Sequence, residues 1–222
     1  MFRQRSADTW FFSEDVYPPV DFSVRVLRHD GLRVAPFDAH PDGEGGLRDL
    51  GLTAEIWQLW LGALIAGHAR IPTLSERLLG RRDPWNDPAA RAELLTIVSR
   101  PSSFCPGPDG LRGRLDELWL AHERAAEEWK TATEAAVGGR YGNGRELWKA
   151  LRRYHDRLPP LTLLPVDYPA PVVMAVPPAT CLIGLDTPDM SAATFRALVL
   201  SGAEALAAGP ERATAGPDRA TG

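Results

Sequence analysis

One long periodic segment limits what this chain can fold into more than any other feature. Between Gly110 and Gly138, apolar or small side chains, interrupted by His122, recur every three or four residues, which is the spacing of an α-helix with one buried face. The stripe consists of Leu111, Leu115, Leu118, His122, Ala126, Trp129, Thr133 and Ala136. Gly138-Gly139 predicts the end of this helix, because glycine readily adopts the backbone conformation that follows one. A fold with a substantial helical layer is therefore expected.

Further helical patterns extend this section over residues 53–158. Thr53 is a suitable N-cap for a helix that is apolar on nearly every side, so Trp57 and Trp60 are expected in the core. Shorter helices are predicted at 73–79, at 87–99, where Asp87-Pro88 supplies a cap and a first-turn proline, and at 145–157.

Strand-like sequence flanks the helical section on both sides. Residues 22–37 alternate around His29-Asp30-Gly31, which predicts a β-hairpin. Short proline-bounded runs at 161–166, 172–176 and 180–185 predict strands, and a closing helix follows to residue 208. Because strands gather at the two ends and do not alternate with helices, the pattern favours an α+β fold. We expect one mixed or antiparallel sheet that includes the hairpin and packs against helices.

The predicted organisation is a single α+β domain over residues 1–208. Residues 1–20 mix aromatic and charged side chains before Pro18-Pro19 and predict an irregular arm. Residues 209–222 contain no large apolar side chain, so a disordered tail is expected.

The charge balance and the cysteine content narrow the class of protein. The formal net charge is −4, so no overall basic field favours nucleic acid as a partner. The most apolar stretch, 59–67, is far shorter than the roughly 20 residues of a membrane-spanning helix. Cys105 and Cys181 are too few for a disulfide framework or a cysteine zinc site, which predicts a cytoplasmic protein. Arginine strongly outnumbers lysine, and alanine, glycine and proline are plentiful, as in bacterial genes of high GC content.

A glycine-rich connection, Gly138–Arg145, is the candidate anion site. Backbone N–H groups at the start of the next helix, together with Arg140, Tyr141 and Arg145, could hold a phosphate or a carboxylate. The alternative is a plain helix–helix connection, because dinucleotide and P-loop sites require the glycine loop to follow a strand. The acidic loop that begins at Asp38 departs from a calcium-binding pattern, and we predict neither a metal nor a cofactor.

Seven tryptophans are the most unusual feature of the composition. Trp119 and Trp148 lie off the main stripes of their predicted helices, which makes them candidates for a protein interface, whereas core packing is the alternative. No motif typical of catalysis is present, which lowers the expectation of an enzyme but does not remove it. The function predicted is that of a bacterial accessory protein that binds another protein. The alternative is a small-molecule enzyme or binder with a cleft between the helical section and the C-terminal strands.

Overall fold

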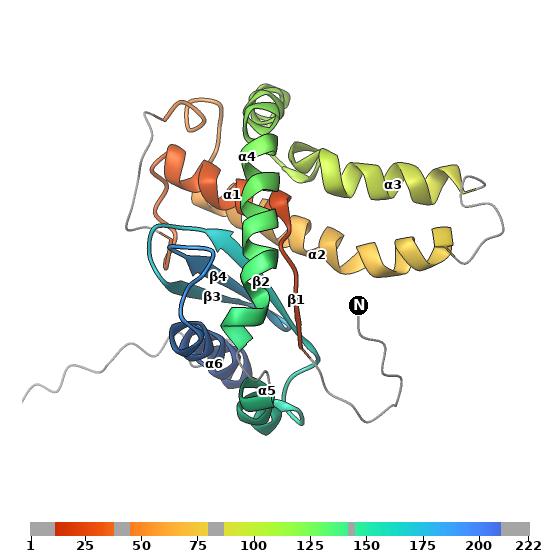
Figure 1. The fold of residues 1–222 in the computed structure, drawn as a ribbon. Coiled ribbons are helices and arrows are strands. Elements are labelled where there is room, and N and C mark those ends of the chain that lie inside the picture. The colour runs from red at the N-terminus through yellow and green to blue at the C-terminus, as the bar shows by residue number, and fades with distance from the viewer. Residues whose placement is uncertain (1–11, 38–44, 80–86, 142–144, 210–222) are drawn as a thin grey trace, which may run out of the picture. The chain divides into compact units, whose positions relative to one another are not determined.

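The computed structural model describes residues 12–37, 45–79, 87–141 and 145–209 (Figure 1). Its helices and a four-stranded mixed sheet confirm the α+β prediction. In chain order the elements are β1 (Phe12–Glu14), α1 (Pro18–His29), α2 (Ala54–Leu79), α3 (Pro88–Ser99), η2 (Pro101–Phe104), α4 (Asp109–Tyr141), α5 (Arg145–Leu151), η3 (Arg152–Tyr154), β2 (Leu161–Asp167), β3 (Val172–Val176), β4 (Thr180–Leu185) and α6 (Ala192–Ala208). The predicted tail lies outside the described residues, except for Gly209.

The sheet has the strand order β1-β2-β4-β3. Strands β1 and β2 run parallel, β2 and β4 run parallel, and β3 pairs antiparallel with β4. The three C-terminal strands are therefore confirmed. Helix α6 lies against β3 and β4 (Figure 1), where Phe195 and Val199 are fully buried.

The predicted hairpin at 22–37 is wrong, because residues 18–29 form helix α1. Pro18 and Pro19 occupy its first positions, where a missing N–H and a fixed φ are no disadvantage. The helix buries nearly its whole circumference, including polar Asp21 and Ser23. An apolar and polar alternation over so few residues therefore failed to distinguish a strand from a buried helix.

The Asp30-Gly31 pair ends α1 and does not turn a hairpin. Gly31 has a φ of 61°, and its N–H donates to the Arg28 carbonyl. The Leu32 N–H donates to the Leu27 carbonyl at 3.0 Å. These two bonds form the glycine C-cap known as the Schellman motif, which uses the same residue types as a tight hairpin turn.

The sheet nevertheless includes an N-terminal strand, from the segment that the sequence predicts as an irregular arm. Phe12 pairs with Leu161, and Glu14 pairs with Leu163. Strand β1 is a short edge strand, and it replaces the hairpin as the N-terminal contribution to the sheet.

The predicted helices are present, but two of them run further than expected, and the helix predicted at 145–157 ends as α5 at Leu151 and is followed only by the short η3. Helix α2 continues through Pro72 and takes in the predicted helix at 73–79, and α4 passes Gly138-Gly139. The Thr53 and Asp87 caps are confirmed, since their side chains accept from the N–H groups of Ile56 and Ala90. Within the described ranges, no helix combines the length and apolar character needed to cross a membrane.

The chain groups into two compact units. The helical unit is residues 17–132, and the sheet unit comprises the chain up to Val16 together with the chain from Thr133 onward. In the helical unit, Trp57 and Trp60 are fully buried, as predicted, and their indole N–H groups donate to the carbonyls of Ser23 and Pro101 at 2.7 Å each. The expectation of a single domain stays a prediction.

Candidate functional site

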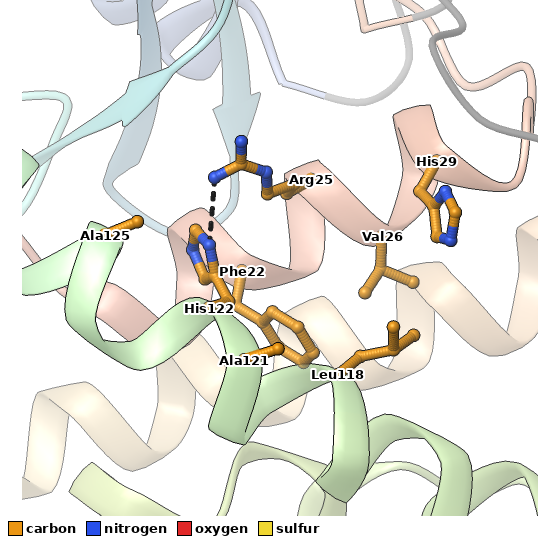
Figure 2. Close-up of a pocket in the computed structure, with 8 residues that line it drawn as sticks. All are labelled: Phe22, Arg25, Val26, His29, Leu118, Ala121, His122 and Ala125. Atoms are coloured by element: carbon orange, nitrogen blue, oxygen red, sulfur yellow. Dashed lines mark hydrogen bonds between the residues drawn. The ribbon is translucent and has the colours of Figure 1, made fainter.

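A hollow of about 410 Å³ lies between α1 and α4 in the helical unit. Figure 2 shows the residues that line it, four from each helix. They are Phe22, Arg25, Val26 and His29 of α1, and Leu118, Ala121, His122 and Ala125 of α4. Each set is spaced by threes and fours, which places its members on one face of its helix. The two small alanine side chains leave room on the α4 face that larger side chains would fill.

The apolar wall of this pocket is held by aromatic packing. Phe22 is only 2% exposed and meets Trp60 and Trp119 edge to face, at ring distances of 6.0 and 5.3 Å. Edge-to-face pairs at such distances are a favoured arrangement of aromatic rings. Val26 is buried beside Phe22, so α1 presents a fixed apolar surface to the pocket.

His122 is a buried histidine whose two ring nitrogens both have partners. Arg25 Nη1 lies 2.9 Å from Nδ1, and Asp21 Oδ2 lies 3.3 Å from Nε2. A guanidinium can only donate, so Nδ1 accepts, and the imidazole proton is on Nε2, where it faces the Asp21 carboxylate. The Phe22 ring is stacked on the imidazole at 5.6 Å. Three polar side chains thus form a connected chain from Asp21 through His122 to Arg25.

Arg25 carries the charge that the pocket presents to solvent. Its side chain is exposed and extends from α1 toward His122 on α4 (Figure 2). Within the described part of the chain, Arg25 has no carboxylate at ion-pair distance. The half-buried His29 lines the same pocket one turn further along α1. A guanidinium beside an apolar wall can bind a carboxylate or phosphate whose organic body rests on that wall.

Other chemistries find less support among the described residues. They contain no group of three or more His, Cys, Asp or Glu side chains that could hold a metal ion. Burial raises the pKa of Cys181 to about 12 and also raises that of Cys105, so both thiols are protonated at neutral pH. Neither cysteine therefore has the thiolate character of a nucleophile.

The predicted anion-binding residues are not tested by this structure. Arg140 and Tyr141 belong to the end of α4 and Arg145 to the start of α5, but their side chains lie outside the described residues. The acidic loop also lies largely outside them, since residues 38–44 are not described.

The two interface candidates lie in different surroundings. Trp119 is 4% exposed and packs against Phe22, so core packing accounts for it. Trp148 is half-buried, and the Arg152 guanidinium lies over its ring at 5.3 Å. Of the two, only Trp148 has ring surface that a partner could reach.

The α1 side of the pocket was missed in the sequence because the segment was interpreted as a strand. Asp21, Arg25 and His29 are spaced by four residues, so they follow one face of α1 once the helix is recognised. Among the pocket residues, only His122 stands out in the sequence, as a polar side chain in the apolar stripe of α4. The proline pair that starts α1 was the signal that could have revealed the site.

The chain matches no protein-family model, no curated protein and no solved structure. The geometry of the pocket is therefore the basis for a functional assignment.

Proposed function

We propose that this protein binds a small organic anion in the pocket between α1 and α4. The observation that carries the proposal is the exposed Arg25 side chain, which lines the pocket together with apolar side chains and has no carboxylate partner among the described residues. The volume is at the lower end of the range for ligand pockets, and a few polar groups on an apolar lining are typical of them. A ligand with a single ring or a short chain and one carboxylate or phosphate suits these dimensions.

The proposal is for binding without catalysis. A general base needs a ring nitrogen that can accept a proton from the substrate. Here Nδ1 of His122 accepts from Arg25 and Nε2 faces Asp21, so both nitrogens are engaged. The imidazole instead fixes the position of the Arg25 guanidinium, which lowers the entropy lost when an anion binds.

Protein–protein binding, the function that the composition favours, rests on a different part of the chain, the half-buried Trp148 of the sheet unit. A bacterial origin and a cytoplasmic location remain proposals that rest on the arginine bias and on the two cysteines.

Isothermal titration calorimetry with benzoate, phenylacetate and phenyl phosphate tests the pocket. Benzyl alcohol and benzylamine supply a neutral and a cationic ligand of similar size. We expect at least one anion to bind with a Kd below about 1 mM. The Arg25→Gln variant should raise that Kd about tenfold or more, because a hydrogen bond to a charged group contributes roughly 1.5–3 kcal/mol. Arg25→Lys should retain part of the affinity because it keeps the charge.

Arg91→Gln on α3 is the matched control, because Arg91 is exposed and does not line the pocket. It should leave the affinity unchanged. Binding of benzyl alcohol as tight as that of the anions, or an equal loss in both glutamine variants, would contradict the proposal.

A further inference from the structure

A short basic segment in the sheet unit differs from the rest of this acidic chain. Residues 149–157 contain four Lys or Arg side chains and one Asp, a local net charge of 4 − 1 = +3, whereas the whole chain carries −4. The four cations are Lys149, Arg152, Arg153 and Arg157, and all are exposed. They lie on α5, on η3 and in the turn that comes after η3.

Aromatic rings hold three of these cations in place. The Arg152 guanidinium lies 5.3 Å from the centre of the Trp148 ring. Those of Arg153 and Arg157 lie 4.8 and 5.8 Å from the centre of the Tyr154 ring, which is itself buried. Arg153 also donates to the Tyr154 hydroxyl at 2.6 Å. Such cation–π contacts restrict the arginine side chains before any partner arrives.

The charge of this segment has no neutralising carboxylate in the part of the chain that the structure describes. Among the described residues, none of the four cations forms an ion pair. The two neighbouring carboxylates have partners of their own, since Glu146 pairs with Arg196 at 2.9 Å and Asp156 with His155 at 2.8 Å. A set of exposed and oriented cations therefore remains available to an anionic partner.

We propose that the basic–aromatic surface, defined as Trp148, Lys149, Arg152, Arg153 and Arg157, docks an acidic segment of a partner protein. Arginine forks match carboxylates in geometry, so three exposed arginines within residues 152–157 favour a run of Asp or Glu side chains. The half-buried Trp148 ring offers contact to an apolar side chain within that run, and Trp, Tyr and Arg are residue types enriched in protein interfaces.

Charge arithmetic favours an acidic polypeptide over nucleic acid. Proteins that bind duplex DNA typically contact about 6–10 phosphates, more than the four cations here can neutralise. The net charge of −4 also repels a long polyanion, whereas a short acidic segment interacts mainly with the local surface.

Fluorescence anisotropy on the full chain tests this proposal with three labelled probes. They are a peptide of alternating Glu and Leu, a peptide of Glu alone, and a single-stranded oligothymidine of the same length. We expect the Glu–Leu peptide to bind most tightly. The variant Arg152→Gln/Arg157→Gln should lower the affinity for this peptide about tenfold or more, because interface arginines often contribute over 1 kcal/mol each.

The matched control is Arg114→Gln/Arg124→Gln, which removes the same charge from α4, where both arginines are exposed. This variant should bind the peptide as the wild type does. Trp148→Ala should weaken binding of the Glu–Leu peptide more than binding of the peptide of Glu alone. Circular dichroism of each variant checks that the fold is retained.

Three results would overturn the proposal. The first is tighter binding of oligothymidine than of either peptide at the same salt concentration, which would assign the surface to nucleic acid. The second is an equal loss of peptide affinity in both double variants, which would indicate unspecific attraction. The third is a failure of both peptides to bind at low salt. None of these outcomes depends on the pocket of the helical unit.

Discussion

The helical unit and the sheet unit differ in what they bury. Of the buried polar or charged side chains among the described residues, the sheet unit contains Thr133 and Thr180, while the helical unit contains Asp21, Ser23, Asp30, His68, Asp87, Ser102 and His122. Buried polar groups destabilise a fold unless they are hydrogen-bonded, so the interior of the helical unit depends on polar partners more than that of the sheet unit does. The difference supports the proposed pocket in the helical unit, whereas the sheet unit has an apolar core and exposes a cluster of basic side chains on α5 and η3 and in the turn after them.

The core of the sheet unit is also the simpler of the two in its chemistry. Strands β2 and β4 are buried along most of their length and consist largely of apolar residues such as Leu163, Leu182 and Ile183. Shape, and not hydrogen bonding, must therefore determine how α6 fits against the sheet. Substitutions in the two units should accordingly reveal different kinds of interaction.

The largest effect is expected from Trp60→Ala in the helical unit. The indole is fully buried and donates to the Pro101 carbonyl, so its removal leaves a cavity and an unsatisfied carbonyl. We expect a loss of about 3–5 kcal/mol in the free energy of unfolding, measured by chemical denaturation. Trp148→Ala is the comparison in the sheet unit and should lower the free energy of unfolding clearly less, since that side chain is only half-buried. Equal losses would show that the two tryptophans have the same structural role.

A substitution at Gly202 tests whether shape controls the sheet unit. A Cβ at this position would lie 2.7 Å from Cys181 Sγ and 2.9 Å from Val173 Cγ2. We therefore expect Gly202→Ala to lower the free energy of unfolding by roughly 1–3 kcal/mol through overpacking. In a double-mutant cycle, Cys181→Ala should remove part of that loss by vacating the space of the sulfur. Strict additivity would indicate that α6 adjusts its position and that close fit matters little.

The sheet unit should also lose stability at high pH through a buried thiol. Burial raises the pKa of Cys181 from 9.0 to about 12. Below pH 9 the thiol is protonated in both states, so its contribution is constant. Between those two pKa values the unfolded chain releases the proton while the folded chain retains it, which favours unfolding by about 1.4 kcal/mol per pH unit. Denaturation curves of wild type and Cys181→Ala over this range should therefore converge as the pH rises, and parallel curves would contradict this.

The smallest effect is expected from Tyr17→Phe in the helical unit. The Tyr17 hydroxyl is buried and donates to the Ile97 carbonyl at 2.7 Å. Deleting it should lower the free energy of unfolding by about 1 kcal/mol, the usual net contribution of a hydrogen bond. A variant as stable as wild type would show that this buried bond contributes nothing, and it would weaken the distinction between the two units.

The sequence predicted the sheet unit better than the site. Proline-bounded apolar runs identified β2, β3 and β4, because a buried strand has few alternatives at that length and composition. Helix α1 escaped detection because the short apolar and polar alternation from Phe22 to Arg28 also fits a strand, and because Asp30-Gly31 is typical of both a helix end and a hairpin turn. With α1 misassigned, Asp21, Arg25 and His29 could not be placed on one face. His122 stands out in the sequence, but its partners Asp21 and Arg25 lie 101 and 97 residues away along the chain, so no local pattern joins them.

The tautomer of His122 and its response to a ligand test the central claim most directly. Long-range proton–nitrogen correlation spectra distinguish the two ring nitrogens of each histidine. We predict that His122 carries its proton on Nε2, and that phenyl phosphate shifts the Nδ1 signal because the anion binds the Arg25 guanidinium that donates to Nδ1. In Arg25→Gln, the same addition should leave His122 unchanged. A proton on Nδ1, or a His122 signal that phenyl phosphate never moves, would contradict the account of this pocket as an anion site built on Asp21, His122 and Arg25.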